Sequence, residues 1–345
     1  MNQRNLLAQF GVDGGLARML RDCRRPESGA AEVFEYGETA PGLLRNTRTF
    51  EASTVETPDG ARLHVREFGP RDGIPIVLVH GFACRVEYWN PQINRLAERH
   101  RVIAYDQRGY ARSTLGTREF TPDALGDDLA TVLAATVRAD QRAVITGHSL
   151  GGIAVMAWAA RHPEQVRRHA REVLLIDTCA ERITAHTEIV PWPRWERGLR
   201  ERVLNALLGR LPMPHPRLLG NQLRNRGLTP TASRAATEFT VAVVGSCPNP
   251  FRTRSMRVLR DLDVTAGLAN LTVPTTVIVG SLDRLTPVSA SLSIAAHLRA
   301  AGTPHRYLEL PGRGHCTTVE EPETITAEIE RAAATDALRG SRDVS

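Results

Sequence analysis

Continuous apolar runs and stretches with helical periodicity alternate along most of this chain, and this alternation is the strongest constraint on its fold. Apolar runs without polar alternation are typical of strands that are buried on both faces of a parallel sheet. The pattern therefore predicts a doubly wound α/β domain with a mostly parallel sheet. The predicted strands cover residues 74–80, 101–105, 143–146, 172–176, 275–279 and 306–310. The predicted helices cover residues 86–99, 122–138, 150–162, 287–301 and 321–338.

A β-hairpin is predicted in front of the first parallel strand. Two alternating segments flank Pro58-Asp59-Gly60, and Asp-Gly between alternating runs is a strong hairpin signal. Residues 1–45 combine a short amphipathic stretch with a polar loop, so we expect an N-terminal extension there. Residues 339–345 are expected to form a C-terminal tail.

The alternation is interrupted once, between Ile176 and Thr275, by a long stretch of helical patterns that prolines punctuate. Such a stretch is too long for a single crossover connection. We therefore predict a helical cap, residues 181–265, that folds over the carboxyl edge of the sheet. The predicted α/β core then consists of residues 46–180 and 266–338.

Apolar residues recur every four positions in the predicted cap, which favours a helix with one buried face over a face that docks on a membrane. They are Trp195, Leu199, Val203, Leu207 and Leu211. Residues 181–260 also hold 14 arginines against 5 acidic residues. Most of these arginines are expected on solvated helix faces, although the excess leaves open a weak contact with an anionic lipid or an anionic substrate.

The chain as a whole is basic, with a formal net charge of +6, but it lacks the usual signature of nucleic-acid binding. Aromatic residues make up 5% and do not interleave with a basic stripe, so no nucleic-acid partner is expected. All 44 basic residues are arginines. The absence of lysine excludes Schiff-base enzymes, pyridoxal-phosphate anchors and lysine-dependent phosphate-binding loops, because arginine stays protonated. We expect no cofactor.

The five cysteines are widely spaced and form no C-x-x-C pair, which argues against a structural zinc site or a disulfide framework. Free thiols are typical of a reducing compartment. The first thirty residues contain no signal-peptide core, and no apolar run is long enough to span a membrane. We therefore expect a cytoplasmic protein without a transmembrane segment and without a bound metal.

The sharpest chemical motif is Gly147-His148-Ser149-Leu150-Gly151, a G-x-S-x-G pattern. It follows an apolar β-run and precedes a helical pattern. An abrupt turn from strand to helix holds a serine in a strained elbow with its hydroxyl exposed. A side chain at either flanking glycine would collide across so tight a turn. We therefore expect Ser149 to be a nucleophile.

A serine hydroxyl needs a base and a group that orients this base. His315 lies in a glycine-rich loop after the predicted strand 306–310, and Asp283 follows the predicted strand 275–279. The order Ser149, Asp283, His315 is expected for a triad on an α/β sheet. Asp177, which follows the preceding strand, is the alternative acid and is otherwise expected to cap its loop.

An oxyanion that forms at Ser149 needs donors, which backbone N–H groups usually supply. We expect one from Leu150, directly after the serine, and one from Phe82, in the loop after the first parallel strand. For His80 we expect a structural role in holding this loop. The charged groups of Asp106-Gln107-Arg108-Gly109 are likewise expected to fix the turn in which they lie.

The motifs H-G-F, D-Q-R-G, G-H-S-L-G-G, G-S-L-D and G-R-G-H, in this order, resemble the α/β-hydrolase family with a helical cap. The resemblance covers roughly residues 50–335 outside most of the cap. It is closest to the branch of lipases and esterases, cofactor-free perhydrolases, epoxide hydrolases and carbon–carbon bond hydrolases. It implies a triad of Ser149, Asp283 and His315, with an oxyanion hole at Phe82 and Leu150.

Departures from the family patterns narrow the branch. Epoxide hydrolases and haloalkane dehalogenases have aspartate at the elbow, where this chain has Ser149. Epoxide hydrolases usually have proline where Ala83 stands, and proline iminopeptidases typically have tryptophan in place of Leu150. The leading hypothesis is therefore hydrolysis of a small-molecule carboxylic ester through an acyl-serine. The alternatives are a carbon–carbon bond hydrolase or thioesterase with the same triad, and a non-catalytic ligand-binding receptor.

Overall fold

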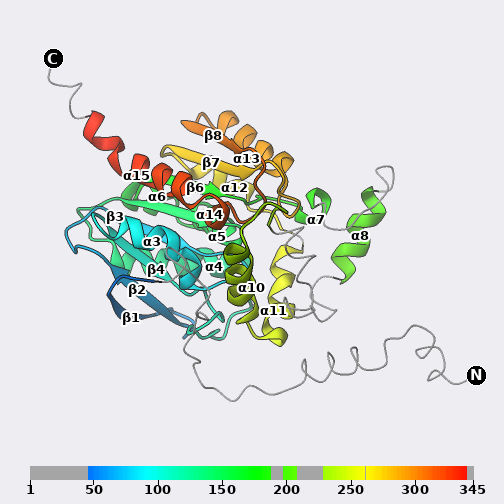
Figure 1. Ribbon diagram of the computed structural model, residues 1–345, viewed down its shortest axis with the longest axis horizontal. Coiled ribbons are helices and arrows are strands. Elements are labelled where there is room, and N and C mark those ends of the chain that lie inside the picture. Colours follow the sequence, from blue (N-terminus) through cyan, green and yellow to red (C-terminus); the bar gives the residue numbers. More distant parts are fainter. Residues whose placement is uncertain (1–45, 188–196, 208–227, 261, 340–345) are drawn as a thin grey trace, which may run out of the picture.

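The computed structural model describes residues 46–187, 197–207, 228–260 and 262–339, and it contains an eight-stranded sheet (Figure 1). The strand order is β1-β2-β4-β3-β5-β6-β7-β8. The β1–β2 and β2–β4 pairs are antiparallel and all others are parallel, which confirms the predicted doubly wound, mostly parallel sheet. The strands are β1 (Phe50–Glu56), β2 (Arg62–Phe68), β3 (Pro75–Val79), β4 (Arg101–Tyr105), β5 (Ala143–His148), β6 (Ala170–Ile176), β7 (Thr275–Gly280) and β8 (His305–Leu310).

Helices cover both faces of the sheet, which explains why the central strands are apolar at every position. In β3, Val77 and Val79 belong to one buried cluster, whereas Ile76 and Leu78 belong to a second cluster on the opposite face. The first face is covered by α4 (Pro122–Thr136), α5 (Leu150–Arg161), α6 (Pro163–His169), α12 (Thr265–Asn270) and α13 (Val288–Ala300). The second is covered by α3 (Asn90–Leu96) and α15 (Pro322–Arg339). Within the described ranges, no helix combines the length and the apolar character needed to cross a membrane.

Most predicted elements agree with the structure to within two residues, but the helix predicted at residues 86–99 is divided. A 3-10 helix, η2 (Val86–Trp89), precedes α3, which carries Pro91 in its first turn. Proline has no N–H to donate, so it is tolerated at a helix start but not inside a continuous helix. The predicted hairpin is confirmed: Thr57 N–H donates to the Ala61 carbonyl at 2.8 Å across the turn.

The described helices between β6 and β7 contact loops at the carboxyl ends of strands (Figure 1). Phe251 lies edge-on to Tyr110, which follows β4, with ring centroids 5.0 Å apart. The Tyr110 hydroxyl also donates to Ser255 Oγ at 3.1 Å. Besides α12, the described helices between β6 and β7 are α7 (Ile183–His186), α8 (Arg197–Leu207), α10 (Arg234–Gly245), α11 (Asn249–Ser255) and η4 (Met256–Leu259). The boundaries of the predicted cap, 181–265, stay a prediction.

The apolar stripe of the predicted cap is not buried where the structure describes it. Leu199 on α8 is 52% exposed and Val203 is half-buried. Among the described elements, α8 packs mainly against the short helix α7, which is too small to cover the stripe. The expectation of a buried face is therefore wrong at Leu199. Trp195 and Leu211 lie outside the described residues, as does the side chain of Leu207.

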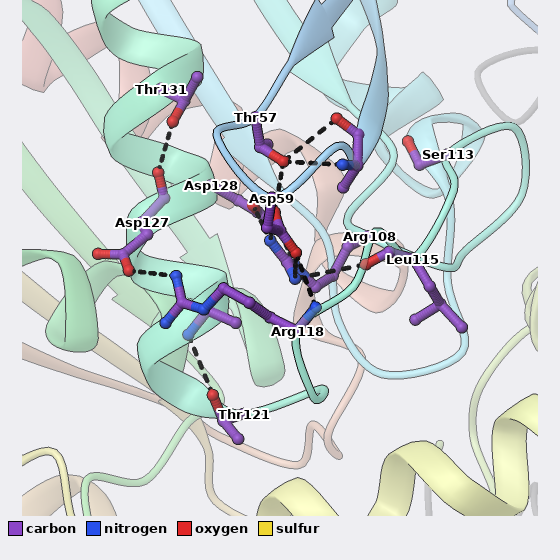
Figure 2. A network of polar contacts seen from close by, with 12 residues as sticks. Thr57, Asp59, Arg108, Ser113, Leu115, Arg118, Thr121, Asp127, Asp128 and Thr131 are labelled. Atoms are coloured by element: carbon purple, nitrogen blue, oxygen red, sulfur yellow. Dashed lines mark hydrogen bonds and ion pairs between the residues drawn. The ribbon is translucent and has the colours of Figure 1, made fainter.

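A buried ion-pair network ties the hairpin turn to helix α4 (Figure 2). Arg108, only 1% exposed, donates to both oxygens of Asp128 on α4, at 2.6 Å each. The same guanidinium donates to both oxygens of Asp59 in the hairpin turn, at 3.0 and 3.1 Å. This confirms that Arg108 fixes its turn, and the forked guanidinium is the group that can satisfy two carboxylates at once.

Replacing Arg108 by methionine should lower the free energy of unfolding by about 3–5 kcal/mol, because it leaves buried carboxylates without their partner. Urea denaturation at neutral pH measures this change. The control is Arg138→Met, which breaks an exposed pair with Asp140 and should leave stability nearly unchanged. Equal effects of the two substitutions would contradict a special role for the buried network.

Candidate active site

Ser149 occupies the sharp turn between β5 and α5. Its backbone angles are φ 52° and ψ −116°, a conformation that costs a non-glycine residue on the order of 1–3 kcal/mol. Two hydrogen bonds hold it there: Ser149 N–H donates to the Ile176 carbonyl at 2.9 Å, and Thr178 Oγ1 donates to the Ser149 carbonyl at 2.7 Å. The side chain is partly exposed, so a ligand can reach the hydroxyl.

The flanking glycines of the motif are required by close backbone approach. A Cβ at Gly151 would lie 2.1 Å from the Val79 carbonyl oxygen, and one at Gly147 would lie 2.5 Å from the Gly151 carbonyl oxygen. Both distances are far shorter than a van der Waals contact with backbone atoms that cannot move aside. The predicted collision across the turn is therefore confirmed at Gly147, whereas a side chain at Gly151 would collide with the neighbouring strand β3.

His315 lies between Ser149 and Asp283. Its Nε2 is 3.0 Å from Ser149 Oγ, and its Nδ1 is 2.9 Å from Asp283 Oδ2. His315 is 7% exposed and Asp283 is 3% exposed, so both are shielded from water. In the neutral tautomer that fits these contacts, Nδ1–H donates to Asp283 and Nε2 accepts from the serine hydroxyl. His315 is thus within hydrogen-bond distance of both Ser149 and Asp283.

Asp283 is itself oriented by its own loop. The backbone N–H groups of Leu285 and Thr286 donate to Asp283 Oδ1 at 2.8 and 3.0 Å. Thr286 Oγ1 donates to the other oxygen, Oδ2, at 2.7 Å. Sequence reasoning missed Thr286, although aspartate side chains commonly accept hydrogen bonds from backbone N–H groups a few residues further on.

Asp177, the alternative acid, is not bonded to the ring of His315. Its Oδ1 accepts from Gly280 N–H at 3.0 Å, and its Oδ2 accepts from Thr317 N–H and Oγ1 at 3.0 and 2.7 Å. Asp177 therefore joins the end of β7 to the loop that follows His315. Burial, followed by the nearby charge of Asp283, raises the pKa of Asp177 well above its usual range.

The charges around His315 favour its protonated form. Burial by itself would lower the pKa of the imidazole, but the carboxylate of Asp283 acts in the opposite direction through its charge and its hydrogen bond. Asp177 and Glu320 add to this effect. The pKa of His315 therefore lies above its ordinary value of 6.5. The ring is poised to accept a proton and to be stabilised as a cation.

The two backbone amides expected to serve the oxyanion belong to Leu150 and Phe82. Leu150 N–H lies at the start of α5, where a helix leaves its first amides without internal partners. Phe82 follows Gly81, and a Cβ at Gly81 would lie 3.3 Å from the Cβ of Ser149. Across the described parts of the chain, neither the Phe82 nor the Leu150 amide donates to an acceptor. Both N–H groups are therefore available to a negatively charged oxygen.

His80 holds the loop that carries Phe82. Its Nε2 accepts from Gln107 N–H at 3.0 Å, so Nδ1 carries the proton and donates to the Gly81 carbonyl at 2.8 Å. Burial lowers the pKa of His80 to about 4, which keeps it neutral. Nearby, Asp106 Oδ1 accepts from Val86 N–H at 2.8 Å. The structural roles expected for His80 and for the turn after β4 are both confirmed.

His148, within the serine motif, makes contacts that the sequence did not predict. Its Nε2 donates to the His315 carbonyl at 2.9 Å, and its ring lies 4.9 Å from that of Tyr88, centroid to centroid. Burial, with the neighbouring charge on His315, lowers the pKa of His148 to about 3. His148 thus braces the backbone of the His315 loop as a neutral ring. Only its position beside Ser149 signals this contact in the sequence.

Metal-binding side chains are not grouped in the described ranges: no three His, Cys, Asp or Glu residues there could hold an ion together. The four described cysteines, Cys84, Cys179, Cys247 and Cys316, are free and buried. The chemical groups that hydrogen bonds bring together are one hydroxyl, one imidazole and one carboxylate. Such a set can perform nucleophilic catalysis at a carbonyl carbon.

Comparisons with known proteins point in the same direction. Residues 76–328 match the model of a family described as the alpha/beta hydrolase family. Pimeloyl-[acyl-carrier protein] methyl ester esterase of Yersinia enterocolitica is 30% identical over 254 residues, which cover 73% of this chain and 90% of that protein. A non-heme chloroperoxidase of Streptomyces lividans is 26% identical and covers 80% of this chain and 97% of its own.

Solved structures share the same fold. An esterase from Rhodococcus matches with a TM-score of 0.66 at 23% identity, covering 82% of this chain and 98% of its own. From the family match and the fold, the chain belongs to the alpha/beta hydrolase family and is a hydrolase.

Proposed function

We propose that this hydrolase cleaves carboxylic esters through an acyl-serine intermediate, with Ser149 as nucleophile, His315 as base and Asp283 as the orienting acid. The observation that carries the proposal is the continuous hydrogen-bonded chain from Ser149 Oγ through His315 to Asp283, at 3.0 and 2.9 Å. The family relation supports it, because the similar Yersinia protein is named a methyl ester esterase.

Acylation follows from this geometry. Ser149 Oγ attacks the ester carbonyl carbon while His315 Nε2 takes its proton, and the carbonyl oxygen becomes an oxyanion facing the Phe82 and Leu150 amides. The carbon–oxygen bond to the alcohol then breaks, and the imidazolium gives the proton to the departing alkoxide oxygen. Asp283 keeps Nδ1 protonated and stabilises the imidazolium while it exists.

Deacylation repeats the steps with water. His315 removes a proton from a water molecule, which attacks the acyl-serine and forms a second oxyanion at the same amides. Collapse of this intermediate releases the carboxylic acid, and Ser149 Oγ recovers its proton from His315. The same groups would serve a thioester or a 1,3-diketone, so a substrate panel that includes both decides among acyl donors.

Ser149→Ala should reduce hydrolysis of nitrophenyl esters by about 10⁴-fold or more, because the nucleophile is lost while binding remains. A fluorophosphonate probe should label the wild-type protein at Ser149, as peptide mass spectrometry would show. Full turnover by the alanine variant would exclude the acyl-serine mechanism. Absence of both a burst and steady turnover of activated esters in the wild type would instead favour the ligand-binding receptor.

The dependence of kcat/KM on pH should show an acidic limb with its midpoint above 6.5, since His315 acts as a base only when neutral and its pKa is raised. Activity is therefore lost as pH falls through this raised value. Asp283→Asn removes the negative charge that raises the pKa of His315, so the acidic limb should move to lower pH. At the same time kcat should fall about 10⁴-fold. A limb that stays in place in this variant would contradict the assignment of Asp283.

Gly81→Ala should lower kcat by about 10²-fold with little change in KM, because the oxyanion loop must shift. The new Cβ would lie 2.8 Å from Nδ1 of His148, a ring that is buried and bonded to the His315 loop. Gly198→Ala is the matched control, since its Cβ meets nothing within 4 Å. Steady-state kinetics on one nitrophenyl ester compares the two. Equal activity of both variants would contradict the assignment of the Phe82 amide to the oxyanion site.

A further inference from the structure

Among the described residues, three side chains bond to the backbone of residues 314–317 around His315, and one of them also contacts the polypeptide between β6 and β7. Asp177 bonds to Thr317 and His148 bonds to the His315 carbonyl, and both belong to the sheet and its strand ends. The third group is Glu320, at the end of α14 (Thr317–Glu320). Glu320 contacts the segment 228–233, which leads into α10.

The two carboxylate oxygens of Glu320 bond to different parts of the chain. Its Oε1 accepts from Gly314 N–H, directly before His315, at 3.1 Å. Its Oε2 accepts from Thr229 N–H at 3.1 Å and from Thr229 Oγ1 at 2.7 Å. Thr229 is 1% exposed, so these bonds are shielded from competing water. One side chain thus bonds to the catalytic loop and to the segment 228–233.

Apolar packing supports the same link. Phe239 and Val243 of α10 belong to the same buried cluster as Cys316 and Val319. Cys316 lies directly after His315, and Val319 lies on α14. Helix α10 packs against α14 and against η2, which follows the loop of Phe82. A shift of the segment 228–233 would therefore reach Gly314 through a hydrogen-bonded and packed contact.

The ionisable groups that face His315 come from four elements. Asp283 follows β7, Asp177 follows β6, Glu320 ends α14, and the neutral ring of His148 ends β5. The three carboxylates each raise the pKa of His315. Removing the charge of Glu320 therefore acts on His315 in a known direction, toward a lower pKa.

We propose that Glu320 is a positioning residue, which holds the His315 loop in its reactive place when Thr229 is seated on it and so couples the segment 228–233 to proton transfer. The inference rests on the proposed ester hydrolysis. Efficient catalysis then requires that Thr229 stays bonded to Glu320. A substrate that displaces Thr229 would bind but would be turned over slowly.

The first test measures His315 directly. NMR titration of the His315 imidazole in Glu320→Gln should show its pKa lowered by roughly half a unit, since the variant keeps the shape and loses the charge. The acidic limb of kcat/KM should move the same way. Glu323→Gln, an exposed glutamate on α15, is the matched control and should move neither. An unchanged His315 titration in Glu320→Gln would overturn the proposal.

The second test measures the coupling. Thr229→Val removes the hydroxyl bond, keeps the charge of Glu320, and should lower kcat about tenfold with a smaller change in KM. Thr229→Ser restores the hydroxyl and should recover kcat, and Thr131→Val on α4, whose hydroxyl bonds only within its own helix among the described residues, should behave as wild type. Glu320→Gln combined with Thr229→Val should be no slower than the slower single variant. Additive losses would refute a shared path.

Thermal denaturation of each variant checks that it is folded, and a loss of kcat that only follows a loss of folded protein would count against the proposal.

The proposed ester hydrolysis and the proposed role of Glu320 can fail separately. Undiminished ester turnover by Ser149→Ala would end the proposed function, whereas the His315 titration requires no substrate and judges Glu320 on its own.

Discussion

The close approach of helix α5 to strand β3 is the constraint on which the site depends. The Gly151 backbone sits so near the Val79 carbonyl that no side chain fits between them. This contact draws the helix start against the strand ends and forces Ser149 into a left-handed conformation. The strain, on the order of 1–3 kcal/mol, is offset by the burial of α5 between the sheet and helix α4.

Around this elbow, buried polar groups find partners at the carboxyl edge of the sheet. Asp177 joins β6 to β7 and to the loop after β8, while Asp106 joins the end of β4 to the start of η2. Each carboxylate accepts backbone N–H groups that would otherwise be buried without partners. Because Asp177 serves this purpose, Asp283 is the carboxylate left facing the imidazole.

Much of this arrangement could be predicted from the sequence, because it depends on local order along the chain. Ser149, Asp283 and His315 each follow a strand of a parallel sheet, and parallel strands end at the same edge. The need for glycine at position 147 is likewise local, because a Cβ there would collide with the Gly151 backbone. Propensity and periodicity were therefore sufficient for the sheet, the elbow and the order of the three residues.

What could not be predicted depends on contacts between distant loops. The bond between Glu320 and Thr229 joins residues 91 positions apart, and no pattern within either segment announces it. The exposure of Leu199 was missed for a related reason: helical periodicity shows which residues share a face, but not whether another element covers that face. The division at Pro91 was visible in the sequence and was outweighed by the apolar spacing around it.

The pairing of β6 with β7 has a consequence for how such a chain can diversify. These neighbours pair in parallel, Val173 opposite Thr275, although residues 177–274 separate them. The entropy lost in closing a loop grows only with the logarithm of its length, so this connection costs about 2 kcal/mol more than a crossover of a dozen residues. Segments of very different length can therefore be exchanged at this point while the sheet, and the reactive groups on its edge, keep their stability.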